Sequence, residues 1–290
     1  MARWFDVIEE DLRKTREASD PDAKATLVFL GTGASCGVPT YYCDCKACRE
    51  AEADPAARRT CSSIAILRSG ATLIDTSPDV HQQLQREGIS DIERVLYTHE
   101  HFDHVGGLPQ LEYYVRLRRR APVDLYCNAE THAHIETHNA FMADTFALHQ
   151  VSLGERMEHD GLFYTPVAAA HCPGTFGYLI GIPAIYSHTG KDRTVAYLPD
   201  TSRPCDETLA ALRGVDLLIL DATFTTGNWM PTQHLDVHDA MALADELEVG
   251  ECWLTHLSMQ FDEPMTTSEL DALLEGSRTR AARDGLRLSL

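Results

Sequence analysis

The chain has 290 residues, of which 44% are hydrophobic and 24% are charged, a balance typical of a globular protein that buries its core without disulfides. No stretch approaches the roughly 20 apolar residues needed to span a bilayer, which excludes a membrane-spanning protein. A formal net charge of −19 repels polyanions, so we expect a small partner rather than a nucleic acid. No low-complexity linker divides the sequence, which favours one large domain.

The N-terminal segment, residues 1–24, differs from the rest of the chain. Phe5, Ile8 and Leu12 recur at helical spacing and predict an amphipathic helix that extends a main domain of residues 25–290. Acidic residues stand where a secretory signal needs a positive flank, which favours a cytoplasmic protein. Two placements of this helix stay open, on its own domain or on a neighbouring subunit of a homodimer.

From residue 25 onward, short β-rich runs alternate with helical segments, an order that favours sheets packed between helices. The predicted strands are Thr26–Leu30, Ser63–Leu67, Thr72–Asp75, Val95–Thr98, Val195–Asp200, Leu217–Asp221 and Cys252–His256. The predicted helices are Asp79–Glu87, Leu108–Arg118, Ala129–Leu148, Val237–Glu246 and Ser268–Arg283. Several of the strands end in Asp or His, at the loops where functional sites are built.

Three of the nine cysteines, Cys43, Cys45 and Cys48, lie close together in the sequence. In a cytosolic chain this spacing favours a metal site over disulfides. Three thiolates on one loop suit structural zinc, which takes four tetrahedral ligands, so a fourth ligand has to come from elsewhere in the chain. The alternative is three reduced, partly buried thiols without a metal.

The run His99–His104, with the sequence HEHFDH, follows a predicted strand and precedes Gly106 and Gly107. Its three imidazoles and the carboxylate of Asp103 exceed what one tetrahedral ion accepts locally. The run therefore predicts two adjacent divalent metal ions. These ligand types suit zinc, manganese and iron, and the sequence does not choose among them.

The pattern His-x-His-x-Asp-His after a strand resembles the metallo-β-lactamase superfamily. The resemblance covers nearly everything from Thr26 onward and implies an α+β fold, the αββα four-layer sandwich. More specifically, the loop Gly31–Ser35, the motif Cys43–Cys48 and the segment Ile74–Asp79 resemble PhnP-type phosphodiesterases. These are the cyclic-phosphate phosphodiesterases of phosphonate breakdown.

This resemblance also implies the metal ligands. The first ion would be held by His99, His101 and His171, the second by Asp103, His104 and His256, with Asp200 bridging them. Each of the three late ligands ends an apolar run in the sequence. Two cations roughly 3.5 to 4 Å apart lower the pKa of a bridging water towards about 7, so the expected nucleophile is a metal-bound hydroxide.

The predicted catalytic residues are Asp103, through its place among the ligands, and His234. His234 lies just before a predicted helix, where this subgroup and the tRNA 3′-processing enzymes of the superfamily keep a catalytic histidine. We expect it to be the general acid that protonates the leaving alkoxide, a contribution of about 10² to 10⁴ in rate. The alternative is a loop histidine without a chemical role. Asp236 either orients His234 or is the N-cap of the helix.

The cysteine motif departs from the family at one position. PhnP-type proteins place the fourth ligand of the structural zinc three residues beyond the last active-site histidine, and Met259 stands there in this chain. A thioether is a poor zinc ligand, so the expected replacement is Cys36, with Cys61 as the second candidate.

The leading hypothesis is a dinuclear phosphodiesterase for a small anionic phosphodiester, with 5-phosphoribosyl 1,2-cyclic phosphate as the first substrate to try. Other hydrolases of the superfamily stay open, namely a tRNA 3′-processing endonuclease, a thioesterase or a lactonase. A non-hydrolytic role, like that of the pyrroloquinoline-quinone biosynthesis factor, ranks below these because all seven expected metal ligands are present.

Overall fold

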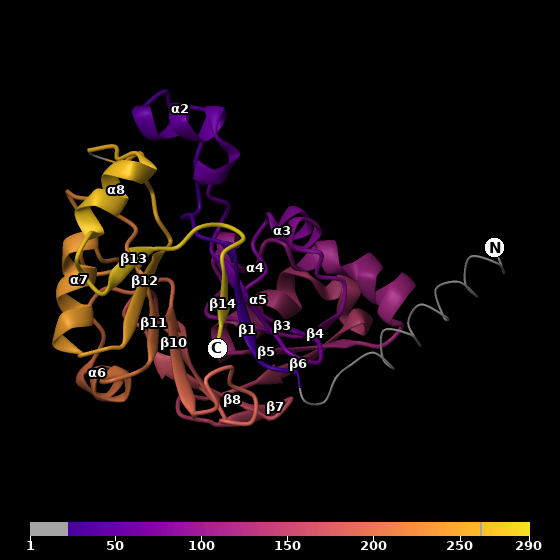
Figure 1. The fold of residues 1–290 in the computed structure, drawn as a ribbon. Helices are drawn as coiled ribbons and strands as arrows, with labels where there is room; N and C mark the ends of the chain where they lie inside the picture. Colours follow the sequence, from indigo (N-terminus) through magenta and orange to yellow (C-terminus); the bar gives the residue numbers. More distant parts are fainter. Residues whose placement is uncertain (1–22, 262) are drawn as a thin grey trace.

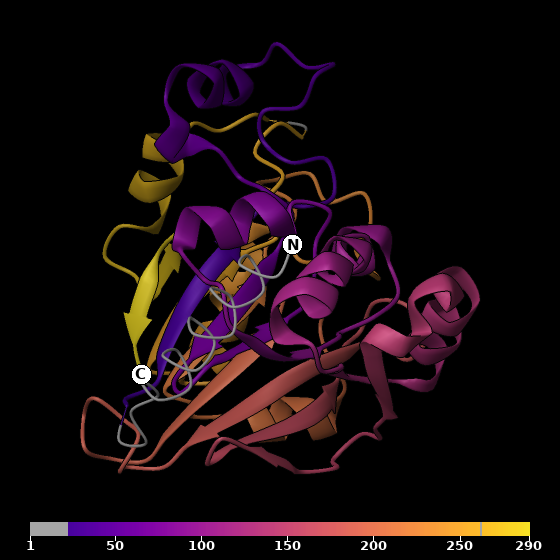
Figure 2. The ribbon, with the colours of Figure 1, turned by 90° about the vertical axis from the view of Figure 1, so that its right-hand side faces the viewer.

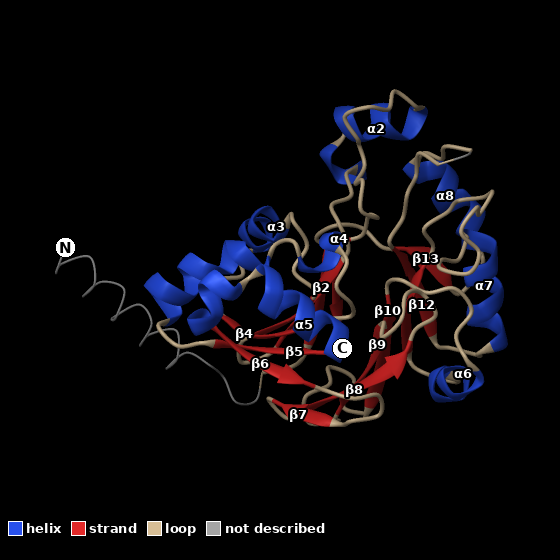
Figure 3. Cartoon of the chain, turned by 180° about the vertical axis from the view of Figure 1, so that it is seen from behind, coloured by secondary structure: helices blue, strands red, loops and turns tan. Residues whose placement is uncertain are grey.

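The structure, a computed structural model, describes residues 23–261 and 263–290, and the predicted helix of residues 1–24 lies almost wholly outside them. Two seven-stranded sheets lie side by side and helices cover their outer faces (Figure 1). The view from behind separates the blue helices of the two outer layers from the red strands between them (Figure 3). Among the described helices, none is long and apolar enough to cross a bilayer.

The first sheet combines strands from the N-terminal half with the last strand of the chain. In spatial order it holds β14 (Arg287–Ser289), β1 (Thr26–Gly31), β2 (Ser63–Leu67), β3 (Ala71–Ile74), β4 (Ile92–Leu96), β5 (Val123–Cys127) and β6 (Phe146–Gln150). Strands β3 to β6 are parallel to one another, while β14, β1, β2 and β3 pair in antiparallel fashion.

The second sheet comes from the C-terminal half of the chain. In spatial order it holds β13 (Thr279–Ala281), β12 (Glu251–Thr255), β11 (Leu217–Asp221), β10 (Arg193–Leu198), β9 (Phe176–Ile182), β8 (Leu162–Ala168) and β7 (Met157–His159). Strands β10 to β13 are parallel, so their carboxyl ends lie at one edge of the sheet.

The helices form two layers, except for one helix that stands apart from both. They are α2 (Lys46–Ala53), α3 (Val80–Glu87), α4 (Phe102–Val105), α5 (Ala129–His138), α6 (Asp206–Leu212), α7 (Val237–Glu246) and α8 (Thr267–Leu274). Helices of the first half lie in front of the strands in Figure 2, and α6, α7 and α8 cover the second sheet in Figure 1. Helix α2 stands away from both layers, above the sheets in Figure 1.

Alternation along the strands separates three apolar cores. In β1, Leu27 and Phe29 point into the core between the two sheets, while Val28 and Leu30 join the core beneath the first helical layer. In β11, Ile219 joins the central core, and its neighbours on either side pack under the helices of the second layer. Three cores imply four layers, which confirms the predicted αββα sandwich.

The single helix predicted for Ala129–Leu148 is wrong in its second half. Helix α5 begins at Ala129 and ends at His138, and the side chain of its N-cap, Asn128, accepts a hydrogen bond from the Thr131 N–H. A 3₁₀ segment at Ala140–Thr145 follows, and the chain then enters β6. Residues Phe146–Gln150 form a strand rather than a helix because their backbone pairs with the parallel strand β5. A local sequence pattern does not contain this contact.

The helix predicted for Ser268–Arg283 is also too long. Helix α8 ends at Leu274, and Gly276 adopts a φ of +79°, a left-handed conformation that favours glycine. The chain then forms β13 beside β12. The predicted helix Leu108–Arg118 is replaced by a 3₁₀ turn and a short π-helix, and further 3₁₀ turns fill the loops.

Candidate metal centre

The His99–His104 run leaves the carboxyl end of β4 and forms a tight loop that includes α4. His99 and His104 are fully buried, and Asp103 is 8% exposed. The loop packs closely on the segment after β3, because a Cβ on Gly107 would lie 2.0 Å from the Ser77 carbonyl oxygen. Glycine is therefore required there, because any side chain would clash with the segment after β3.

A buried carboxylate at the end of β3 orients two of these imidazoles. Asp75 adopts a φ of +68°, which is uncommon for a residue other than glycine, and its Oδ2 accepts a hydrogen bond from His104 Nδ1 at 2.8 Å. The hydroxyl of Thr98 donates to Asp75 at 2.9 Å and therefore accepts the proton of His99 Nδ1 at 3.0 Å. Both rings consequently keep Nε2 free for a metal ion.

The other three predicted ligands come from the second sheet. His171 follows β8, Asp200 follows β10 and His256 follows β12. His171 Nδ1 donates to the Gln233 carbonyl oxygen at 3.1 Å, which leaves its Nε2 free, 3.1 Å from His101 Nδ1. His256 adopts a φ of +57°, so strained backbone lies on both sides of the site.

The structure brings all seven predicted ligands together. Asp200 lies in the middle, with Oδ2 2.9 Å from His104 Nε2 and Oδ1 3.2 Å from His256 Nε2. Asp103 Oδ2 lies 3.3 Å from His256 Nε2 and 3.4 Å from His104 Nε2. His99 groups with His104 and Asp200 and also with His101 and His171, so Asp200 lies near predicted ligands of both ions.

The donor atoms fit metal ions better than hydrogen bonds. His99 Nε2, His104 Nε2 and Asp200 Oδ2 are buried and have no hydrogen-bond partner, a costly arrangement in a protein interior. Burial lowers the pKa of His104, but Asp200 and Asp103 outweigh this effect and raise it well above its usual value. The cluster therefore has an excess of negative charge and unused lone pairs, which divalent cations would satisfy.

His234 lies beside this cluster and is 7% exposed. Its Nδ1 donates to Asp221 Oδ2 at 2.7 Å, which leaves Nε2 as the free nitrogen, and its ring centroid lies 4.7 Å from that of His171. The Thr223 hydroxyl donates to Asp221 at 2.9 Å and accepts from His256 Nδ1 at 2.8 Å. One carboxylate and one hydroxyl thus orient His234 and His256 together.

The partner of His234 was not foreseen from the sequence. Asp236, the candidate for that role, is instead the N-cap of α7 and accepts a hydrogen bond from the Asp239 N–H. Asp221 was visible as a strand-terminal carboxylate, but its pairing with His234 depends on a contact across a loop. The roles of Thr98 and Thr223 had no sequence signal, because a buried threonine is ordinary in a strand or loop.

The cysteine motif forms a second cluster, at the start of α2. The Sγ atoms of Cys43, Cys45 and Cys48 lie within 4.8 Å of one another, and in the described residues no fourth ligand joins this group. Cys36, the expected fourth ligand, is elsewhere: its Sγ accepts a hydrogen bond from Gln260 Nε2 at 2.8 Å. The structure therefore does not bring Cys36 to the three thiols, because the loop directs it toward the segment after β12.

The remaining candidates for a fourth ligand also lie apart from the three thiols. Cys61 is buried and its Sγ lies 3.6 Å from the Ser35 carbonyl oxygen. Met259 is buried in the apolar core of the second helical layer. Within residues 23–261 and 263–290 the cluster therefore offers three protein ligands, one fewer than a structural zinc ion takes.

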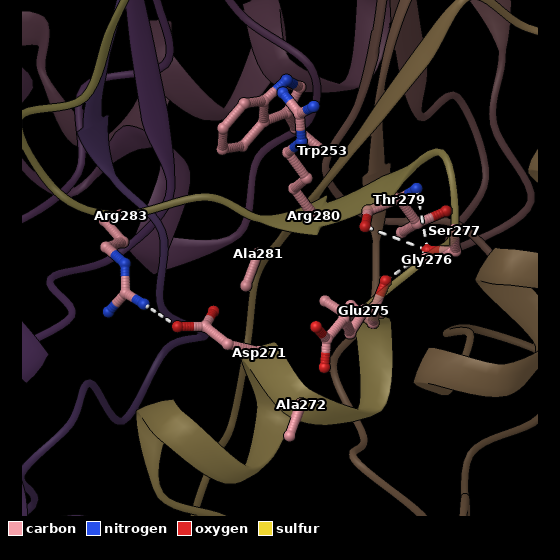
Figure 4. A pocket seen from close by; sticks show the side chains of 11 residues that line it. Trp253, Asp271, Ala272, Glu275, Gly276, Ser277, Thr279, Arg280, Ala281 and Arg283 are labelled. Carbon is pink, nitrogen blue, oxygen red and sulfur yellow. Dashed lines mark hydrogen bonds and ion pairs between the residues drawn. The ribbon is translucent and has the colours of Figure 1, made fainter.

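A cavity of about 550 Å³ lies between α8 and β13, and its lining includes no residue of either cluster (Figure 4). Arg280 lies over the ring of Trp253 at 5.7 Å, and Arg283 pairs with Asp271. No histidine or cysteine lines this cavity, and none of its residues is a predicted metal ligand. It is therefore not part of the metal centre.

Sequence relatives point to the same superfamily. Residues 71–257, more than half of the chain, match the family model described as a β-lactamase superfamily domain. Coenzyme PQQ synthesis protein B of Methylobacterium radiotolerans is 29% identical over 312 residues, which cover 91% of this chain and 99% of that protein. The octanoyltransferase of Porphyromonas gingivalis is 45% identical over 86 residues, 29% of this chain, and the match spans only 17% of that protein's length.

Solved structures share the fold. A diphosphatase from the PhnP family superposes with a TM-score of 0.78 at 31% identity, over 91% of this chain and 96% of that one. Zn²⁺-bound PqqB from Methylobacterium extorquens superposes with a TM-score of 0.74 at 25% identity, over 91% and 100% of the two chains. The chain therefore belongs to the β-lactamase superfamily and has the metallo-β-lactamase fold of metal-dependent hydrolases.

Proposed function

We propose that this protein is a dinuclear metal-dependent phosphodiesterase that hydrolyses a small cyclic or strained phosphodiester. The observation that carries the proposal is the convergence of seven predicted ligands, three of which have buried donor atoms without a hydrogen-bond partner, with an oriented histidine beside them. The similarity to a PhnP-family diphosphatase supports phosphate chemistry in particular.

In this proposal, His99, His101 and His171 hold one ion, Asp103, His104 and His256 hold the other, and Asp200 contacts both. When bound, such ions supply a nucleophile at neutral pH and neutralise phosphate oxygens. Zinc, manganese and iron suit the ligands, and the zinc of the PqqB structure makes zinc the first metal to test.

His234 supplies the proton that the leaving alkoxide needs. Asp221 accepts the Nδ1 proton and stabilises the charged ring, so the proton to be transferred is the one on Nε2. Because Asp221 already accepts from the Thr201 N–H and from Thr223, its carboxylate cannot rotate freely. The ring therefore keeps its Nδ1 proton on Asp221 both when it is charged and after it has given up the Nε2 proton.

The substrate in this proposal is a small anion rather than a nucleic acid. The formal charge of −19 repels a polyanion, while two bound cations would attract a single phosphate group locally. We therefore place 5-phosphoribosyl 1,2-cyclic phosphate first and a diphosphate ester second, the latter because of the PhnP-family diphosphatase.

The test combines metal analysis with turnover of a substrate panel: phosphoribosyl cyclic phosphate, cyclic nucleotides, a diphosphate ester, a lactone and a thioester. We expect about two ions at the centre and diester turnover that falls by about 10² to 10⁴ in His234→Ala while the metals stay bound. A protein that binds no metal after reconstitution, or that turns over only the lactone or thioester, would contradict the proposal.

A role in cofactor biosynthesis is the second candidate, favoured by the match to Coenzyme PQQ synthesis protein B over 99% of that protein. It predicts metal binding without turnover of any phosphodiester in the panel. The same experiment therefore separates the two candidates.

A further inference from the structure

One thiol lies among the histidines of the first predicted ion position. Cys172 directly follows His171, and its Sγ lies within 4.8 Å of the ligand nitrogens of His99, His101 and His171. Cys172 belongs to no motif that the sequence analysis singles out. Three imidazole nitrogens and one thiol sulfur this close together are donor types that a zinc ion binds.

Two further observations concern the surroundings of this thiol. His99 Nε2 is fully buried, has no hydrogen-bond partner and belongs to the same group of atoms, so a ligand position faces it. Cys172 Sγ lies 3.1 Å from the Thr175 hydroxyl, and the Cys172 N–H donates to the same oxygen at 3.3 Å. Thr175 therefore fixes both the backbone and the side chain of Cys172.

We propose that Cys172 Sγ is a further ligand of the ion held by His99, His101 and His171. The proposal rests on the metal centre of the proposed function, not on its substrate. On metal binding the thiol would lose its proton to solvent and donate as a thiolate, so the ion would have three nitrogen donors and one sulfur donor beside the oxygen of Asp200. Thiolate selects thiophilic ions, so this position favours zinc, cobalt or iron over manganese.

The experiment is a comparison of the cobalt-substituted proteins, wild type, Cys172→Ser and Cys205→Ser, by absorption spectroscopy. A thiolate ligand gives cobalt a charge-transfer band in the near ultraviolet that oxygen and nitrogen ligands do not give. The three thiols near α2 contribute equally to all the proteins, so the difference spectrum isolates Cys172. Cys205 is the matched control because it is an exposed cysteine that belongs to neither cluster.

We expect Cys172→Ser to lose part of the charge-transfer band and to keep the visible bands of cobalt bound by histidine, while Cys205→Ser matches wild type. Competition titrations should show a loss of about tenfold or more in Zn²⁺ affinity at this position, with a smaller change for Mn²⁺. Cys172→Ala, checked by circular dichroism, gives the same result if the serine variant folds poorly.

If a folded Cys172 variant has the same cobalt spectrum and the same Zn²⁺ affinity as wild type, Cys172 is not a ligand. That result would overturn this proposal and leave the proposed histidine and aspartate ligands unaffected. Absence of histidine-bound cobalt in the wild type would overturn both. A protein that shows the Cys172-dependent band but hydrolyses no phosphodiester would support this ligand and contradict the proposed function alone.

Discussion

Two buried Asp–Thr pairs, one from each half of the molecule, orient four histidines of the centre in closely similar ways. In the first half, Asp75 and Thr98 fix the rings of His99 and His104. In the second half, Asp221 and Thr223 fix the rings of His234 and His256. In each pair the carboxylate accepts one Nδ1 proton, and the threonine hydroxyl links the carboxylate to the second ring.

The pairs differ in what their histidines do. Both rings of the first pair are predicted metal ligands, whereas only His256 of the second pair is one, and His234 is the proposed acid. A carboxylate on Nδ1 thus serves two purposes: it presents a lone pair to an ion, or it stabilises a ring that gives up a proton. If this distinction is correct, equivalent changes in the two pairs will affect different measurements.

The largest expected effect follows from Asp221→Asn. Each oxygen of Asp221 accepts two hydrogen bonds. The NH₂ group of an asparagine would therefore face a hydrogen-bond donor in either orientation of the side chain. We expect the wrong tautomer of His234 and a fall in kcat of about 10² to 10⁴, with bound metal retained. Steady-state kinetics with metal analysis measures this. Asp236→Asn, which keeps an N-cap on α7, is the control and should turn over normally; a similar loss in both variants would argue against a specific role for Asp221.

The matching change in the first pair, Asp75→Asn, should act on metal affinity. Loss of the acceptor for His104 Nδ1 weakens an oriented ligand, and such losses cost about 10- to 100-fold in affinity. Titration with a chelator would measure the change. Asp124→Asn, which removes a partner of His149 away from the centre, is the control. Unchanged metal affinity in Asp75→Asn would show that Asp75 does not support metal binding through His104.

The hydroxyls of the two pairs should matter about equally for folding of the metal-free protein. Thr98→Val and Thr223→Val each leave a buried imidazole N–H without an acceptor, which costs about 1 to 3 kcal/mol in the free energy of unfolding. Urea unfolding measures it, with the exposed Thr137→Val as the control. A loss confined to one of the two variants would mean that only that pair is formed in the absence of metal.

The smallest effect concerns a histidine outside both pairs. Burial, with the nearby charge of Arg94, lowers the pKa of His159 to about 4. The unfolded chain therefore takes up a proton near pH 6.5 that the folded chain does not, and stability falls as the pH drops from about 6.5 to about 4. His159→Gln should flatten this part of the urea-unfolding profile relative to wild type and to the exposed His188→Gln. An unchanged slope would assign the acid sensitivity to the two pairs.

The parts of the fold that could be predicted are those with a strong local pattern. The strands β1, β2, β3, β11 and β12 were found within one or two residues, because each is a short apolar run that ends at a polar residue. The local pattern predicts helix at β6 and β13, because each strand is short and acquires its conformation only by pairing with β5 or β12. Helix propensity is a weak preference, and tertiary pairing overrode it.

By itself, the sequence determined the superfamily, the four-layer sandwich and a set of seven ligands that the structure brings together, because a contiguous motif and the strand ends before each later ligand are local features. Only the tertiary structure decided the partners of those ligands. The loops that meet at the edge of the two sheets decide three placements. They put Asp221 rather than Asp236 beside His234, keep Cys36 away from the cysteine cluster and place Cys172 among the histidines. Most of these contacts join residues far apart in the chain, so the spacing of the residues in the sequence does not predict them.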